Sequence, residues 1–194
     1  MQARTKKQVL FIHGAGEGAH AEDARLAASL GEKLGSDYAV RYPKMPREDD
    51  PEYAVWKRSI GAELASMGDD AVLVGHSIGG SVLIRILTDG NLAGRVAALF
   101  LVSAPFWHDD EVWHWKEVEL PRGAAELLPR DMPMFLYHGR DDEVVPFSHI
   151  GMYAQAFPRA IVRALDGRNH QLNEDLTEVA ADITGLKQAA RLSR

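Results

Sequence analysis

The chain of 194 residues is 46% hydrophobic and 26% charged, a length and balance typical of one folded domain, which we expect to span residues 1–194. Its 22 Lys and Arg residues against 28 Asp and Glu residues give a net charge of -6, which argues against a nucleic-acid partner or an anionic membrane surface. Cysteine is absent, so disulfides, thiolate metal sites and a cysteine nucleophile are excluded.

The apolar segments of the sequence are all short. The longest uninterrupted run, Val96–Val102, falls far below the ~20 residues that a membrane-spanning helix needs. Near the start, residues 9–12 form an apolar stretch that ends at His13, and this is too short for the core of a secretory signal. We therefore expect a cytoplasmic protein with no membrane partner.

Short apolar runs alternate with longer amphipathic stretches. The runs predict β-strands at residues 8–13, 38–42, 71–75, Val96–Val102, 134–138 and 160–165. Apolar periodicity or a continuous apolar stretch predicts helices at residues 26–34, 56–67, 78–87, 147–157 and 172–186. For the second helix, Asp50 and Pro51 are the expected N-cap and first residue. The alternation predicts an α/β fold, a three-layer α/β/α sandwich around a mainly parallel sheet of about six strands.

Residues 75–79 read Gly-His-Ser-Ile-Gly and join the third predicted strand to an apolar helix. A nucleophile elbow requires this strand–turn–helix context, because the sharp turn exposes its central residue and leaves room only for small neighbours. The helix N-terminus also favours negative charge near the serine hydroxyl. We predict Ser77 as the nucleophile, against the alternative of a small turn residue, and assign His76 to packing or pocket shape.

A serine nucleophile needs a general base and an acid that orients it, and on this kind of fold they follow in the order serine, acid, histidine. Asp141 and Asp142 follow the fifth predicted strand, and His170 follows the sixth. Both groups thus lie at the strand ends that also carry Ser77. We predict His170 as the base, while the residues alone leave both aspartates open as the acid.

The remaining histidines have simpler explanations. His149 falls within a helical pattern, where a solvated face accounts for it, and His138 ends a strand, where a buried hydrogen-bonded role is expected. His108 and His114 lie near acidic residues, but their spacing is not diagnostic of a metal ion. We therefore predict no metal site.

Acyl transfer also needs hydrogen-bond donors for the oxyanion that forms on the former carbonyl oxygen. One backbone amide is expected from Ile78, directly after the nucleophile, and a second from the glycine-rich loop 13–18, where we choose Ala15. The same loop resembles a dinucleotide fingerprint, but its third glycine is misplaced and no ribose-binding acid is evident. We expect no cofactor.

Residues 105–121 break the alternation of strands and helices. The segment contains Trp107, Trp113 and Trp115 among acidic residues, and it leaves the carboxyl end of the fourth strand, where open α/β sheets bind ligands. Its aromatic residues either dock on the core or line a substrate site, and the two interpretations are compatible. We predict that Trp107 and Trp113 contact substrate.

Taken together, these residues resemble the α/β-hydrolase superfamily over nearly the whole chain. The landmarks are His13-Gly14, the elbow at Ser77, the segment His-Gly-Arg-Asp-Asp-Glu-Val-Val-Pro at 138–146, and the late His170. The family pattern His-Gly-x-x-Asp followed by Val-Pro selects Asp142 as the acid. By size, by the helix around Trp56 and by the loop after the fourth strand, the chain is most similar to the small serine hydrolases of the retinoblastoma-binding protein 9 and YdeN group, without a large cap domain.

The resemblance implies an esterase-like serine hydrolase that cleaves a carboxylic ester or thioester through an acyl-enzyme, with Ser77, His170 and Asp142 as the triad. Its partner would be a small-molecule ester or acyl substrate. A second hypothesis, suggested by the aromatic segment, is a catalytically weak α/β-hydrolase-fold binding module or scaffold. Since the length leaves little room for a lid, substrate choice should depend mostly on residues 105–121.

Overall fold

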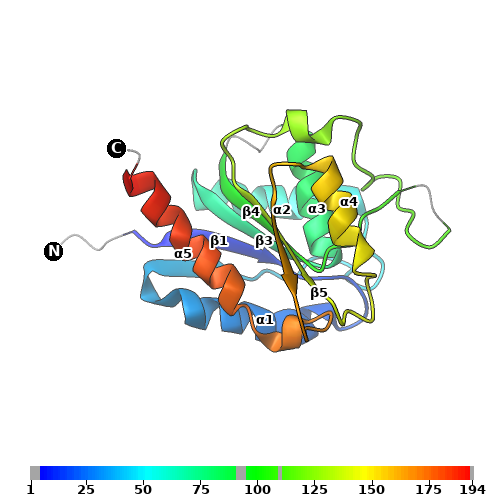
Figure 1. Cartoon of the computed structure of the whole chain (residues 1–194), viewed down its shortest axis with the longest axis horizontal. Coiled ribbons are helices and arrows are strands. Elements are labelled where there is room, and N and C mark those ends of the chain that lie inside the picture. The colour runs from blue at the N-terminus through cyan, green and yellow to red at the C-terminus, as the bar shows by residue number, and fades with distance from the viewer. Residues whose placement is uncertain (1–4, 91–94, 109–110, 193–194) are drawn as a thin grey trace.

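The computed structural model describes residues 5–90, 95–108 and 111–192 (Figure 1). Its sheet has six strands, all paired in parallel, in the order β2-β1-β3-β4-β5-β6. The strands are β1 (Lys7–Ile12), β2 (Tyr38–Arg41), β3 (Ala71–His76), β4 (Val96–Val102), β5 (Met134–Gly139) and β6 (Ile161–Leu165). The helices are α1 (Ala19–Leu34), α2 (Tyr53–Met67), α3 (Ile78–Thr88), α4 (Ser148–Ala156) and α5 (Thr177–Leu192), with short 3₁₀ turns η1 (Gly35–Asp37), η3 (Ala124–Leu127) and η4 (Leu172–Glu174).

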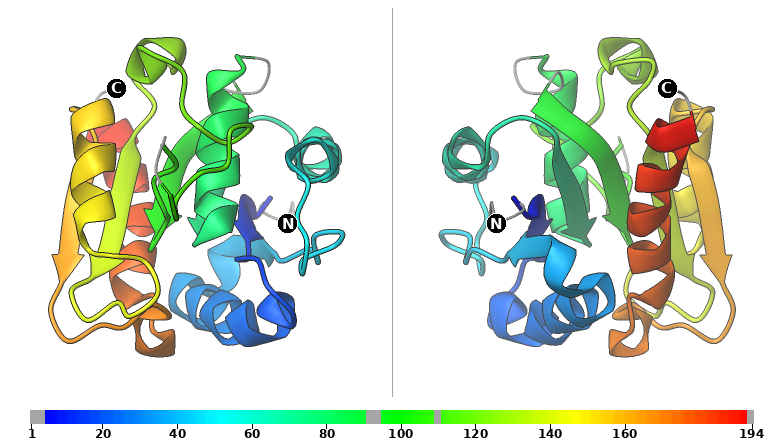
Figure 2. Two further views of the ribbon diagram at one scale, coloured as in Figure 1. Left: turned by 90° about the vertical axis from the view of Figure 1, so that its right-hand side faces the viewer. Right: turned by 90° about the vertical axis from the view of Figure 1, so that its left-hand side faces the viewer.

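Helices cover both faces of the sheet, as predicted. Side chains alternate between the faces of a strand, so Leu10 and Ile12 of β1 join one apolar cluster and Val9 and Phe11 join the other. Helices α2, α3 and α4 pack on the first face, and α1 and α5 pack on the second (Figure 2). A parallel sheet that is buried on both faces needs continuous apolar strands, which explains why most of the strands are recognisable in the sequence.

The start of α2 differs from the sequence prediction. Helix α2 begins at Tyr53 with Glu52 before it, so the predicted cap at Asp50 and Pro51 is wrong. Asp50 instead closes a preceding turn, because its amide donates to the carbonyl of Arg47 and its carboxylate pairs with the Arg47 guanidinium. Side chains that bond locally in this way compete with helix formation.

The last helix also starts later than predicted, since α5 begins at Thr177 rather than near Leu172. Leu172, Asn173 and Glu174 all adopt positive φ, at 45°, 56° and 60°. A helix cannot continue through left-handed residues, so this turn separates the apolar Leu172 from the helix. The turn follows His170 directly, which makes it part of the candidate site.

The connection between β4 and β5 adds little to the sheet edge where the strands end. In the described part of that connection, η3 is the only helical turn, so the fold has no cap domain. Elsewhere in the described chain, none of the helices combines the length and apolar character needed to cross a membrane. The carboxyl edge of the sheet is therefore bordered by loops and not by a helical cap domain.

Candidate active site

Ser77 occupies a sharp turn between β3 and α3. Its backbone has φ 50° and ψ -128°, a conformation that residues with side chains seldom adopt and that usually marks a functional position. The Ser77 amide donates to the carbonyl of Val102 at 2.8 Å, which fixes the turn against β4. Ser77 is half-buried and directly follows the carboxyl end of β3.

Glycines make this turn possible through close backbone contacts. A Cβ atom added at Gly75 would lie 2.5 Å from Cα of Gly80, and one added at Gly79 would lie 2.4 Å from the carbonyl oxygen of His13. Both distances are far inside van der Waals contact with backbone that cannot move aside. The small neighbours predicted for a nucleophile elbow are thus required by packing at Gly75 and Gly79.

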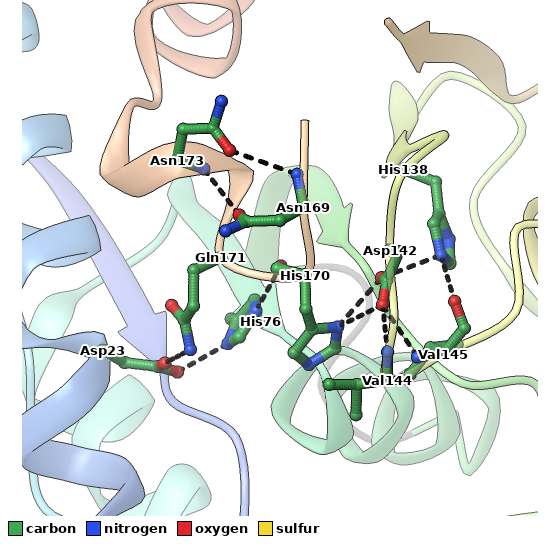
Figure 3. Close-up of polar contacts among 10 residues, drawn as sticks. All are labelled: Asp23, His76, His138, Asp142, Val144, Val145, Asn169, His170, Gln171 and Asn173. Atoms are coloured by element: carbon green, nitrogen blue, oxygen red, sulfur yellow. Dashed lines mark hydrogen bonds and ion pairs between the residues drawn. The ribbon is translucent and has the colours of Figure 1, made fainter. Parts of the chain in front are cut away.

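Asp142 and His170 meet at the same edge, although α4, β6 and the loops around them separate the two residues along the chain. Nδ1 of His170 lies 2.9 Å from Oδ2 and 3.1 Å from Oδ1 of Asp142 (Figure 3). Because an ionised carboxylate only accepts, Nδ1 donates to Asp142, and in the neutral imidazole Nε2 then keeps its lone pair. This is the arrangement of a general base oriented by an acid.

The Asp142 carboxylate is fully buried and held by several donors. The amides of Val144 and Val145 donate to Oδ1 at 2.9 and 2.8 Å, and Nε2 of His138 lies 3.0 Å from Oδ2. Burial by itself raises the pKa of Asp142, but hydrogen bonds from His138 and His170 hold this pKa well below its usual range. Asp142 is therefore ionised, and His138 has the buried, hydrogen-bonded role that the sequence predicts.

The alternative acid, Asp141, makes no hydrogen bond to His170 in the described chain. Its side chain is exposed, and its amide donates to the carbonyl of Arg168 at 3.1 Å. The structure thus pairs His170 with Asp142, the residue that the family pattern selects, and leaves Asp141 on the surface.

Hydrogen bonds and close backbone packing fix the loop that carries His170. The amide of Asn173 donates to Oδ1 of Asn169 at 2.8 Å, and the amide of Asn169 donates back to Oδ1 of Asn173 at 3.2 Å (Figure 3). Backbone of the same loop packs on the end of β5, since a Cβ added at Gly139 would lie 2.0 Å from the carbonyl oxygen of Arg168. The reciprocal amide bonds stabilise the left-handed turn at residues 172–174 and set the position of His170.

The two amides predicted for the oxyanion hole differ from their neighbours. The Gly14 amide donates to the Asp23 carboxylate on α1 at 2.8 Å, and the Gly16 amide donates to the carbonyl of Glu48 at 2.7 Å. Between them, the Ala15 amide bonds to no acceptor in the described chain, and the same holds for the Ile78 amide. Both residues are half-buried, and the oxyanion-hole role of their amides stays a prediction.

One expected contact does not form. Within the described chain, no hydrogen bond joins the Ser77 hydroxyl to His170. The link is indirect: Nε2 of His76 lies 3.1 Å from the carbonyl oxygen of His170, and the two imidazole rings are 4.8 Å apart. Nucleophile–base hydrogen bonds are often long before substrate binds, so the role of Ser77 stays a prediction.

A second Asp–His pair lies behind the first, and sequence reasoning missed it. Nδ1 of His76 lies 2.7 Å from Oδ2 of Asp23, and both side chains are only 2% exposed. The signal was present, because Asp23 lies on the buried face of α1 with Leu26 and Leu30. An acid on an apolar helix face needs a buried partner, but the spacing to His76 gave no means of identifying it.

The aromatic segment packs against α4. The Trp107 ring meets those of Trp113 and Trp115 edge-on at 5.9 and 5.7 Å, and Trp113 lies 4.8 Å from the ring of His149. His149 is buried and accepts the Phe106 amide at 2.8 Å, so its predicted place on a solvated helix face is wrong. The docking interpretation of the segment therefore holds, while substrate contact by Trp107 and Trp113 stays a prediction.

Part of the same segment, residues 109–110, lies outside the described residues. His108 and His114 form no metal centre with the other described side chains, because the described chain contains no group of three or more His, Asp or Glu residues that could hold a metal ion. The polar chemistry described at this edge of the sheet is therefore that of Ser77, the two Asp–His pairs and the available backbone amides.

Comparison with known proteins agrees with this architecture. A model described as the Alpha/beta hydrolase family matches residues 9–184. Est1E from Butyrivibrio proteoclasticus is 18% identical with a TM-score of 0.70, covering 97% of this chain and 90% of Est1E. The ydeN gene product from B. subtilis is 20% identical with a TM-score of 0.70, covering 94% of this chain and 100% of that chain.

A hydrolase of 2-hydroxy-6-oxo-6-phenylhexa-2,4-dienoate from Rhodococcus sp. strain RHA1 has a TM-score of 0.76 at 15% identity, with 96% of this chain and 92% of that chain covered. At such identities the solved structures share the fold. No curated protein matches the chain significantly.

Proposed function

The chain belongs to the α/β hydrolase family, and from that premise we propose that it is a serine hydrolase that cleaves a carboxylic ester or thioester through an acyl-enzyme intermediate. The observation that carries the proposal is the Asp142–His170 pair, with Nδ1 bound to the acid and Nε2 left as a base. It lies at the sheet edge where Ser77 occupies a strained turn, as a nucleophile and its base must.

In the first half-reaction, Nε2 of His170 takes the proton from Oγ of Ser77 as Oγ attacks the substrate carbonyl carbon. The carbonyl π electrons move to oxygen, and the amides of Ala15 and Ile78 stabilise the resulting oxyanion. When the intermediate collapses, the bond to the alcohol or thiol breaks, and the proton on Nε2 passes to that leaving group. The acyl group remains on Ser77.

In the second half-reaction, His170 takes a proton from water while the water oxygen attacks the acyl carbon. Collapse of this intermediate breaks the bond to Oγ, returns the proton to Ser77 and releases the carboxylic acid. Asp142 keeps its negative charge throughout and stabilises the His170 imidazolium, which is consistent with the low pKa that its hydrogen bonds give it. No cofactor takes part.

An apolar acyl group suits the surroundings of the proposed oxyanion hole. Ala15 and Ile78 pack against the same apolar cluster as Trp107, so a substrate carbonyl at the two amides would lie near apolar surface. This supports the aromatic segment, with Trp107 and Trp113, as the part of the molecule that selects the acyl chain.

The test is hydrolysis of p-nitrophenyl esters and acyl thioesters over a range of chain lengths. Ser77→Ala is expected to lower kcat by several orders of magnitude, because a triad acts as one unit. Ser103→Ala is a matched control, since Ser103 also has positive φ at the end of the neighbouring strand but is fully buried. Turnover near the wild-type rate in Ser77→Ala would exclude the proposed nucleophile.

A further inference from the structure

His76 has both ring nitrogens bound to groups that accept. Nδ1 lies 2.7 Å from Oδ2 of Asp23, and Nε2 lies 3.1 Å from the carbonyl oxygen of His170 (Figure 3). A neutral imidazole has one N–H and can satisfy only one such acceptor, whereas an imidazolium donates from both nitrogens. The geometry of His76 is therefore that of a buried cation.

Asp23 is the matching buried anion. Its Oδ2 also accepts the amide of Gly14 at 2.8 Å, and its Oδ1 accepts Nε2 of Gln171 at 2.9 Å. Three donors on one carboxylate favour its charged form. Burial alone would raise the pKa of Asp23, but the charge and hydrogen bond of His76 lower it to about 2.

The same pairing also shifts the pKa of His76. Burial alone would lower the pKa of His76, but the charge and hydrogen bond of Asp23, together with the carbonyl of His170, raise this pKa above its ordinary value. Asp142 adds negative charge from the β5–α4 loop, and the His170 ring lies 4.8 Å away. The electrostatic surroundings thus agree with the two-donor geometry.

We propose that Asp23 and His76 form a buried ion pair that positions the nucleophile, the base and the oxyanion loop relative to one another. His76 precedes Ser77 in the chain and donates to the backbone of His170, while Asp23 binds Gly14 beside Ala15. One pair therefore joins the elbow, the His170 loop and the oxyanion loop. Asp23 and His76 are positioning residues, and their effect on turnover depends on the function proposed above.

The substitution Asp23→Asn removes the negative charge of residue 23 while it keeps the shape of the side chain. The asparagine carbonyl can still accept from Gly14 and His76. Its amide faces Gln171, whose Oε1 is buried without a partner in the described chain and can turn to accept. Without the negative charge of Asp23, the doubly protonated form of His76 is no longer stabilised. His76 is then expected to lose one proton and, with it, one of its two hydrogen bonds.

The protonation of His76 is measured directly by NMR of protein labelled with ¹⁵N-histidine. In wild type, both ring nitrogens of His76 are expected to carry protons at pH 7, and in Asp23→Asn only one. Backbone ¹⁵N relaxation should show greater mobility at His170 and Gln171 in this variant. A singly protonated His76 in the wild-type protein would overturn the proposal, and this readout requires no enzyme activity.

Kinetics provide the second readout. Because a misplacement of about 1 Å can cost about 10²-fold in rate, Asp23→Asn is expected to lower kcat by about 10²-fold with little change in KM. The control is Asp182→Asn on α5, which removes the charge of a carboxylate that binds Tyr137 and Arg163 away from the site. This control is expected to lower stability but not kcat.

The two readouts distinguish failure of this inference from failure of the proposed function. Wild-type kcat in Asp23→Asn, or unchanged mobility of His170, would contradict the positioning role. A wild-type protein without turnover, but with a doubly protonated His76 and a His170 loop that loosens in Asp23→Asn, would instead contradict the hydrolase proposal and leave the ion pair in place.

Discussion

The two Asp–His pairs of this molecule contain the same chemical groups and differ in what surrounds the histidine. His170 donates from Nδ1 to Asp142 and leaves Nε2 available, whereas His76 is bonded at both nitrogens. The side chain of His170 is 9% exposed and that of His76 only 2%. Access and the number of acceptors therefore decide whether such a pair serves as a base or as a structural ion pair.

The carboxylates differ in the same way. Asp142 accepts from a second histidine and from amides of its own loop, so its contacts lie mostly within one turn. Asp23 accepts from Gly14, His76 and Gln171, which come from three distant parts of the chain. The first carboxylate orients one ring, and the second joins separate segments of the site.

The largest expected difference between the pairs is in turnover. Asp142→Asn is expected to lower kcat by about 10⁴-fold, because an amide at this position favours the wrong His170 tautomer. Asp23→Asn leaves Nε2 of His170 as a base, so its expected loss is smaller. Ester hydrolysis by both variants, measured with the same substrate, makes the comparison. Equal losses would show that the two pairs are not distinct in function.

Stability should depend on pH through the Asp23–His76 pair, with opposite signs for the acid and the histidine. The pKa of Asp23 is lowered to about 2, so its stabilising effect is complete above pH ~4 and is lost as the pH falls toward 2, by about 2 kcal/mol. The pKa of His76 is raised, so its contribution is complete below its unfolded value and declines as the pH rises through the folded one.

Urea unfolding between pH 2 and pH 9 tests this dependence. The wild-type free energy of unfolding should fall more steeply below pH 4 than that of Asp23→Asn, and more steeply at alkaline pH as His76 loses its proton. Parallel curves for the two proteins would mean that Asp23 is not a buried anion in the native state.

A smaller effect is expected at Gln171, which touches only the second pair through its side-chain amide. Gln171→Leu removes one donor from Asp23 and leaves the bonds to His76 and Gly14 intact. We expect a fall in kcat of less than tenfold and a loss of about 1 to 3 kcal/mol in stability. A loss of turnover as large as that of Asp23→Asn would move the positioning role from the ion pair to Gln171.

The smallest effect on the catalytic groups is expected from the aromatic segment. Trp107→Ala and Trp113→Ala should change the ratio of kcat/KM between short-chain and long-chain esters by about tenfold, since apolar pockets discriminate chain length at this level. Unfolding should remain cooperative but occur at a lower temperature than in wild type, because each variant loses a packed ring. If both variants only unfold and the ratio is unchanged, the rings serve docking alone.

The sequence was sufficient for most of the strands because β1, β3, β4 and β5 contain short apolar runs, which a sheet buried on both faces requires. It placed Ser77, Asp142 and His170 at one sheet edge by the same reasoning. The sequence did not predict hydrogen bonds between residues that are far apart along the chain. The cap at Asp50 was wrong because Arg47 binds that side chain, and the pairing of Asp23 with His76 depends on how α1 packs beside β3.

The central claim is that Ser77 is an activated nucleophile, and covalent labelling tests it most directly. Folded wild-type protein is treated with a fluorophosphonate, and the modified residue is identified by intact mass and peptide mapping, with Ser77→Ala, His170→Ala and Ser103→Ala alongside. We expect one adduct, on Ser77, that is absent from the first two variants and present in the third. No adduct on the folded wild-type protein, which would favour a binding module, or an adduct on another residue, would contradict it.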